Sequence, residues 1–161
     1  MTSYTGVQAA VRGPEMGVAA LLQLNPVTNS ASPSVYWEPL VFKFKIAETK
    51  TAIGTDDYTY TAFVAPRAMI VMGCWLVDPV GVSVDATNYN TYTLIQSATT
   101  VCSATSARGV VAYLPKEVSL ANTEANRTLT AHETVTFKIA GTSSGAAIHE
   151  NTEVWVICKP A

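Results

Sequence analysis

The chain has 161 residues, of which 14% are charged and 48% hydrophobic, and its formal net charge is −2 at pH 7. A soluble domain usually carries about 25% charged residues, so this composition predicts a surface covered by neutral polar side chains or by other subunits. The weak negative charge excludes the basic footprint of a nucleic-acid-binding protein, and the longest apolar run, Met69–Val77, is too short to span a membrane. We therefore expect neither nucleic acid nor membrane as a partner. The first residues lack a secretory signal, which predicts synthesis in a cytoplasm.

Residues 1–35 differ from the remainder of the chain, because Gly and Pro recur in them without any sustained period. This pattern predicts an extended N-terminal arm and linker. The arm is too apolar for a typical disordered tail, so we expect it to dock on a partner. The residues expected to anchor the arm and to fix its base are Val18, Leu21, Leu22, Leu24, Tyr36 and Trp37. Trp37 has three possible roles: a staple for the arm, an interface anchor or a sugar-stacking platform.

A two-residue hydrophobic period begins after Tyr36 and predicts β-strands. The strands expected from this period and from the intervening turn residues cover residues 42–46, 58–64, 69–77, 82–84, 91–96, 109–114, 134–140 and 153–159. The Ser/Thr/Ala-rich residues 97–107 are expected to form a loop, and residues 116–127 a polar connection. No alternation of strands with helices is seen, which argues against an α/β fold.

The segment Met69–Val77 is apolar at every position except Gly73. A strand that is apolar on both faces is central in a sandwich or is buried at a subunit interface. Gly73 predicts a bulge or a close approach of another group. We expect Trp75, and Trp155 in the last predicted strand, to pack in the core.

Candidate chemistry is sparse in this sequence. His132-Glu133 and His149-Glu150 lie in predicted loops and lack the spacing of a zinc site, so exposed turns are the favoured interpretation. Asp56-Asp57 predicts a turn, and a calcium site shared with Asp78 or Asp85 is the alternative.

Three cysteines, Cys74, Cys102 and Cys158, have no metal-ligand spacing. Cys74 and Cys158 lie in apolar runs, and we expect buried free thiols. No nucleophile signature is present. The sequence therefore predicts no cofactor, no metal and no enzymatic activity.

These features predict an all-β protein, an antiparallel sandwich or barrel of about seven or eight strands with an N-terminal arm. The expected division is residues 1–35 as arm and linker and residues 36–161 as the β-sandwich domain.

Two stretches, at residues 63–71 (FVAPRAMIV) and 129–137 (LTAHETVTF), resemble the strand–turn–strand sequences of small decoration (cement) and head accessory proteins of tailed bacteriophages. The resemblance covers residues 36–161. It implies a jelly-roll-like sandwich and a homotrimer on the capsid surface of a virion, synthesised in the host cytoplasm. It further implies that the protein binds across subunits of the major capsid protein, often through a terminal arm, and stabilises the shell.

Two other functions compete with this one. A carbohydrate- or receptor-binding β-sandwich module of a phage fibre or tail would need an exposed aromatic cluster beside polar groups. A cupin-like enzyme would need His and carboxylate side chains converging from inward strand positions, and the two histidines of this chain lie in predicted loops.

Overall fold

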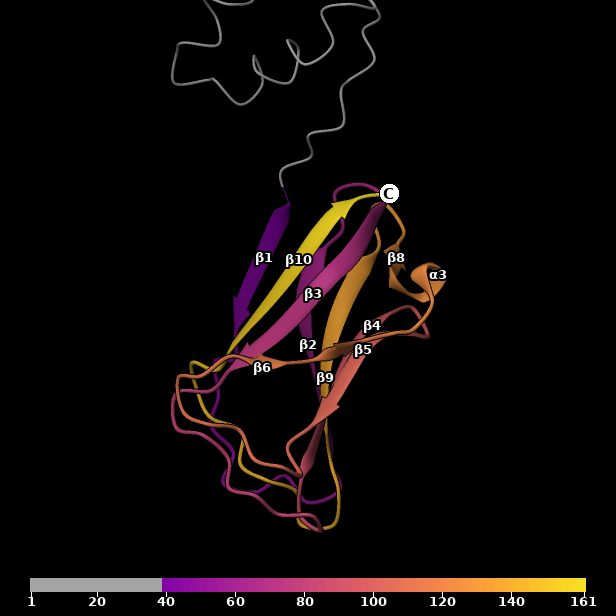
Figure 1. Cartoon of the computed structure of the whole chain (residues 1–161). Coiled ribbons are helices and arrows are strands. Elements are labelled where there is room, and N and C mark those ends of the chain that lie inside the picture. The colour runs from indigo at the N-terminus through magenta and orange to yellow at the C-terminus, as the bar shows by residue number, and fades with distance from the viewer. Residues whose placement is uncertain (1–38) are drawn as a thin grey trace, which may run out of the picture. The chain divides into compact units, whose positions relative to one another are not determined.

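The computed structural model describes residues 39–161. The six residues expected to anchor the arm, and the expected boundary after residue 35, lie outside this range. Within it the chain forms two antiparallel sheets (Figure 1). The expected all-β sandwich is therefore confirmed for the described residues.

The first sheet has the strand order β1-β10-β3-β6, and β8 also pairs with β3. Its strands are β1 (Leu40–Lys45), β10 (Glu153–Pro160), β3 (Met69–Val77), β6 (Lys116–Glu117) and β8 (Thr128–Leu129). The second sheet has the order β2-β9-β4-β5-β7. Its strands are β2 (Asp57–Val64), β9 (Thr134–Gly141), β4 (Asn90–Gln96), β5 (Thr99–Thr105) and β7 (Ser119–Leu120), and a short helix α3 (Glu124–Arg127) precedes β8.

The strand order is that of a jelly roll. When β1–β6, β9 and β10 are counted in chain order as eight strands, one sheet contains the first, eighth, third and sixth, and the other the second, seventh, fourth and fifth. Two interlocking Greek keys give this arrangement. No helix among residues 39–161 is long and apolar enough to cross a membrane.

The core lies between the two sheets and is built from the inward positions of the alternating strands. Phe137 of β9 is fully buried, with its ring edge-on to Phe44 of β1 at 5.5 Å and stacked with Tyr92 of β4 at 6.3 Å. Phe42 of β1 stacks on Phe63 of β2 with ring centroids 4.0 Å apart. Aromatic pairs therefore join the two sheets across the sandwich.

Three expectations for individual segments are wrong. Residues 97–107 contain the strand β5 rather than a loop, because Val101 and Cys102 turn inward and the backbone pairs with β4. Residues 109–114 form a loop in which Val111 and Leu114 are exposed. Residues 82–84 contribute one isolated bridge, Val82 to Val110, rather than a strand.

The predicted bulge in β3 is confirmed. Gly73 pairs with Ile157 of β10, whereas Val71 pairs with the next residue, Cys158, so Met72 is an extra residue in β3. The bulge lets both Val71 and Cys74 face the core, although strict alternation places them on opposite faces. The expected close approach is also present, because the Trp75 ring lies where a Cβ of Gly73 would be.

The three cysteines are free and buried, as expected. The Cys102 thiol and burial raise the pKa of the Cys74 thiol, and burial raises the pKa of Cys158 to about 12. We expect none of the thiols to react with a chromogenic disulfide reagent at pH 8 in the native protein, and all three to react in guanidinium chloride. Rapid reaction of one thiol without denaturant would contradict the buried arrangement.

Candidate functional site

Two long loops lie side by side at the end of the sandwich opposite Leu40 and Ala161 (Figure 1). One, at residues 78–89, joins β3 to β4, and the other, at 106–115, joins β5 to β6. Val82 and Val110 exchange two backbone hydrogen bonds of 2.8 Å, and the Tyr113 N–H donates to the Asp78 carbonyl at 2.8 Å. The two loops therefore form one hydrogen-bonded unit.

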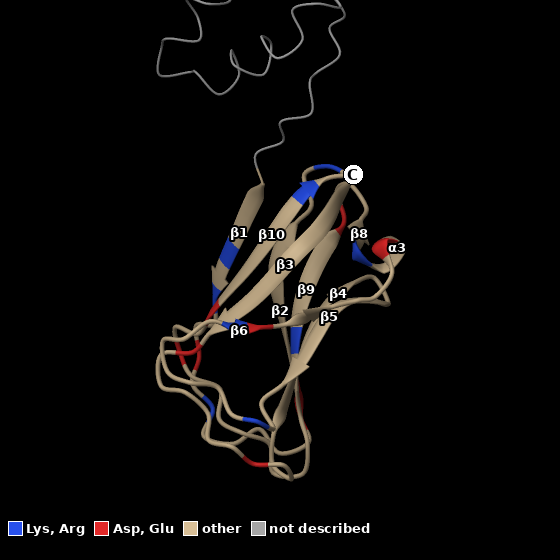
Figure 2. Cartoon of the chain, viewed as in Figure 1, with Lys and Arg blue, Asp and Glu red and all other residues tan. Residues whose placement is uncertain are grey.

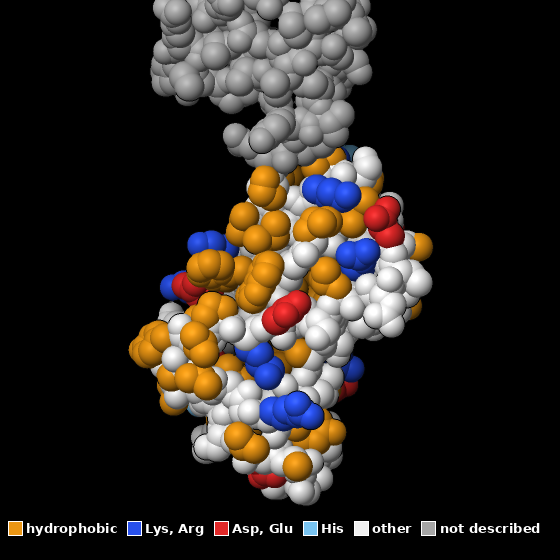
Figure 3. All heavy atoms as spheres, in the orientation of Figure 1, with side chains coloured by type: hydrophobic (Ala, Val, Ile, Leu, Met, Phe, Trp, Pro, Cys, Tyr) orange, Lys and Arg blue, Asp and Glu red, His pale blue; other side chains and the backbone are white. Residues whose placement is uncertain are grey.

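This unit presents an apolar surface, which we call the loop patch. Its members are large apolar side chains between 57% and 76% exposed: Val80, Val84, Val111, Tyr113 and Leu114. Hydrophobic side chains gather over these loops at the lower left of Figure 3. Single exposed apolar residues are ordinary, but a group of them on paired loops is a candidate interaction surface.

The backbone under the loop patch is constrained. Tyr113 has a φ of 59°, a left-handed conformation that is unfavourable for a residue with a side chain. Gly81 has a φ of 86°, and a Cβ there would lie 2.8 Å from the Val110 carbonyl oxygen and 2.9 Å from the Ala112 nitrogen. Glycine is thus required where the loops touch, and the contact holds the Tyr113 ring out in solvent.

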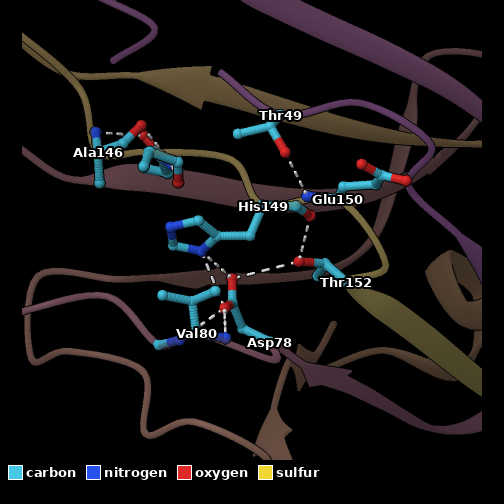
Figure 4. A network of polar contacts seen from close by, with 10 residues as sticks. Thr49, Asp78, Val80, Ala146, His149, Glu150 and Thr152 are labelled. Carbon is cyan, nitrogen blue, oxygen red and sulfur yellow. Dashed lines mark hydrogen bonds and ion pairs between the residues drawn. The ribbon is translucent and has the colours of Figure 1, made fainter. Parts of the chain in front are cut away.

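A buried carboxylate organises the first of these loops (Figure 4). Asp78 is 2% exposed, and its Oδ1 accepts hydrogen bonds from the backbone N–H of Val80 at 2.8 Å and Gly81 at 2.6 Å. His149 Nδ1 lies 2.9 Å from both carboxylate oxygens. The Thr152 hydroxyl lies 3.2 Å from Asp78 Oδ2 and donates to the His149 carbonyl at 2.7 Å. Asp78 therefore joins the loop patch to the loop between β9 and β10.

This arrangement orders the loops around it. The Thr152 hydroxyl is buried and bound to neighbouring oxygens, so it cannot reach a substrate in solvent. His149 Nδ1 is within hydrogen-bond distance of both carboxylate oxygens of Asp78, so these three atoms are engaged with one another. The expectation that His149 is an exposed turn residue is wrong, because Asp78 draws its side chain inward.

A second polar cluster fixes the loop between β9 and β10 from the other side. The Asn90 side chain, fully buried, donates to the carbonyls of Ala146 and Ala147 and accepts from the Ala146 N–H. The Glu150 N–H donates to the Thr49 hydroxyl at 3.1 Å. The loops at this end are thus tied to one another by side chains as well as by backbone.

A second apolar surface, the outer-sheet patch, covers the face of β1, β10 and β3 that points away from the core. Its members are Val41, Met72, Trp75, Val77, Trp155 and Ile157. Hydrophobic side chains gather over these strands in Figure 3. The expectation that Trp75 and Trp155 pack in the core is wrong: the core faces of β3 and β10 hold Cys74, Leu76, Val154 and Val156 instead.

Polar groups on this face are paired with one another. The Trp155 indole N–H donates to Glu153 Oε2 at 2.9 Å, and Lys45 lies 3.1 Å from Glu153 Oε1. These two contacts hold the pKa of Glu153 below its ordinary value. Lys43 Nζ lies 3.8 Å from the centre of the Trp155 ring. The polar groups around Trp155 therefore already have partners within the sheet, whereas Glu117, which pairs in register with Trp75, is exposed.

The acidic residues considered for calcium are not brought together. Asp57 forms an ion pair with Lys138, Asp78 binds His149, and Asp85 accepts backbone N–H groups of its own turn. Among residues 39–161 no group of three or more His, Cys, Asp or Glu side chains could hold a metal ion. His132 and Glu133 lie exposed in the turn before β9. Charged residues are scattered over the described part of the chain (Figure 2).

No family model and no curated protein matches this chain. Among solved structures, the structure of infectious bursal disease virus, Gx strain, is 15% identical, with a TM-score of 0.39. The VP2 subviral particle of the same virus is 18% identical, also at 0.39. Each match covers 76% of this chain and 33% of the other, so this chain spans about a third of those proteins. Similarity of this size does not assign a function.

The loop patch was not recognised from the sequence. Its apolar residues lie within or after a turn signal, Asp78-Pro79-Val80-Gly81, and end before Pro115. The sequence signal for this patch is a set of apolar residues enclosed by turn residues. Such a segment cannot continue as a strand, so its apolar side chains are left exposed on a loop.

Proposed function

We propose that this chain is a virion structural protein, a decoration (cement) protein that binds across subunits of a major capsid protein and stabilises the shell. The observation that carries the proposal is the loop patch. Five large apolar side chains stand more than half exposed on loops that a buried aspartate holds in place. Such a surface becomes favourable when a partner covers it.

The chemistry of the loop patch suits a protein partner. Tyr113 offers a large ring at small entropic cost, and the neighbouring Val and Leu side chains need no hydrogen-bond partners. Because the loops are already ordered, binding loses little additional conformational entropy. Burial of this surface at a joint between capsid subunits would add free energy to the shell.

The fold and the composition agree with this role. Jelly rolls occur in viral capsid proteins, lectins and cupins, so the fold leaves the function open. A cupin needs inward-facing metal ligands, whereas His149 here is bound to a structural carboxylate. The expected arm, with Val18, Leu21, Leu22 and Leu24, is a second contact to the capsid in this proposal, and Tyr36 and Trp37 fix its base.

A carbohydrate- or receptor-binding role is the second candidate, favoured by one observation. The Trp75 ring lies over Gly73, as a sugar-stacking platform would. The polar groups beside the neighbouring Trp155 are already paired, however, which leaves few donors and acceptors for sugar hydroxyls there. Specific binding on a glycan array, lost in Trp75→Ala or Trp37→Ala, would support this role.

The test of the proposed function adds the purified chain to virions from its source that have been stripped of it. Sedimentation with the particles measures binding, and heat release of the genome measures shell stability. We expect the Tyr113→Ser/Leu114→Ser variant to lose most binding, and deletion of residues 1–30 to weaken it as well.

The matched control is Val64→Ser, which removes an apolar side chain 53% exposed on β2, in the other sheet and outside both patches. This variant should bind as the parent does. Unchanged binding of the loop variant would exclude the loop patch, and unchanged binding of the deletion variant would exclude the arm. Absence of the chain from virions would overturn the proposed function as a whole.

A further inference from the structure

The outer face of the first sheet carries a row of four residues that runs across the strands. Lys43 of β1 pairs in register with Trp155 of β10, Trp155 with Trp75 of β3, and Trp75 with Glu117 of β6. The two central members are tryptophans, and the outer members are exposed residues of opposite charge. The row thus reads positive, aromatic, aromatic, negative.

The two neighbouring rows extend this surface. On one side, Val41 pairs with Ile157, and Ile157 pairs with Gly73. Gly73 has no side chain, and the Trp75 ring fills the space that a side chain would occupy there. On the other side Glu153 pairs with Val77, and Lys45 neutralises Glu153. The centre of the face is therefore apolar. Lys43 and Glu117 lie at the two ends of the tryptophan row, and a further exposed charge, Lys159, lies farther along β10.

Such a row is complementary to itself. A twofold axis that runs parallel to the strands, in the plane between two stacked sheets, reverses the order of the row in the second copy. Lys43 then faces Glu117 of the partner subunit, and Trp155 faces Trp75 of the partner subunit. Sheets stack about 10 Å apart with strands nearly aligned, which this axis permits. A twofold axis forms each contact twice.

We propose that two copies of this chain associate through the outer faces of their β1-β10-β3-β6 sheets, with the Lys43–Trp155–Trp75–Glu117 rows stacked in opposite order. The occupant of the outer-sheet patch is a second copy, because the charges at the row ends match the same row reversed. The inference rests on the outer-sheet patch alone and does not depend on the capsid role.

The experiment measures the mass of the full chain in solution over a range of concentrations, by light scattering and sedimentation equilibrium. We expect a species of twice the 17.1 kDa chain mass. Lys43→Glu and Glu117→Lys should each weaken self-association about tenfold or more, because each places like charges opposite one another twice. The double variant Lys43→Glu/Glu117→Lys should recover dimerisation.

A mixture of the two single variants gives the sharpest result. Lys43→Glu and Glu117→Lys chains should pair with each other more strongly than either pairs with itself. Both positions are exposed, so the circular dichroism and the melting temperature should stay close to those of the parent. Glu124→Lys, an exposed charge reversal on α3, is the matched control and should leave the dimer unchanged.

Gly73→Val is an independent variant that acts on the apolar centre. A Cβ at Gly73 would lie 2.1 Å from the Trp75 ring, so the ring must leave its position. We expect loss of the dimer. A parent chain that stays monomeric at several milligrams per millilitre would overturn the inference, as would a trimer whose mass is unaffected by the charge reversals.

Discussion

An Asp78→Ala variant is expected to lose about 4 kcal/mol of its free energy of unfolding, because it removes a buried carboxylate and leaves several buried hydrogen-bond donors without their acceptor. The substitution deprives the backbone N–H groups of Val80 and Gly81 of their acceptor. It also leaves His149 largely buried beside a cavity. Urea unfolding followed by tryptophan fluorescence measures the loss.

Two further variants separate the parts of this effect. Asp78→Asn keeps an acceptor for the two backbone groups but removes the charge opposite His149, so its loss should be intermediate. Asp85→Ala removes a carboxylate that caps a similar turn through the N–H groups of Thr87 and Asn88, at a more exposed position. Its loss should be much smaller. Equal effects at Asp78 and Asp85 would show that burial of the network is unimportant.

A Phe137→Ala variant is expected to lose about 4 kcal/mol, the usual consequence of opening a large cavity in a packed core. Phe137 is fully buried and contacts Phe44 of the opposite sheet as well as Tyr92 of its own. Removal of its ring therefore weakens the contact between the sheets. The midpoint and slope of urea unfolding measure the change.

Phe137→Leu is the matched control, because it keeps most of the apolar volume and should lose far less stability. Phe63 is only partly buried and stacks on Phe42. The loss of stability in a Phe63→Ala variant should therefore lie between the losses of these two variants. A Phe137→Ala loss below about 1 kcal/mol would mean that the core closes over the missing ring.

The sequence predicts the strands whose alternation is clear, and it fails where alternation is absent. The bounds of β3 agree with the expected 69–77, and β9 and β10 differ from expectation by one residue at one end. β5 was missed because its residues are small and neutral, and because two consecutive residues, Val101 and Cys102, are buried. The segment becomes a strand because it pairs with β4, and its own hydrophobic pattern does not reveal this pairing.

The outer-sheet patch shows a second limit of sequence reasoning. Alternation correctly places Trp155 and Ile157 on one face of β10, but it does not say which face is inward. Both faces of β3 are apolar, so the core could have taken Trp75 or Cys74. The outcome depends on how the two sheets pack, and the smaller side chains Cys74, Val154 and Val156 are the ones buried between them.

The network around Asp78 was invisible for a different reason. Asp78 and His149 are separated by 71 positions in the sequence, and neither lies in a motif. Only the jelly-roll topology brings the end of β3 beside the loop before β10. The turn at Asp78 was predicted, whereas the partner that buries its carboxylate required the fold.

The position of β10 in its sheet also bears on how the protein is made. β1 pairs with β10 and with no other described strand, and β10 also supplies one edge of β3. While residues 153–160 remain inside the ribosome, β1 and β3 have unpaired edges and Phe42 and Phe44 lack a finished sheet around them. Folding of this domain therefore completes only after translation of residues 153–160, and until then the nascent chain exposes unpaired strand edges.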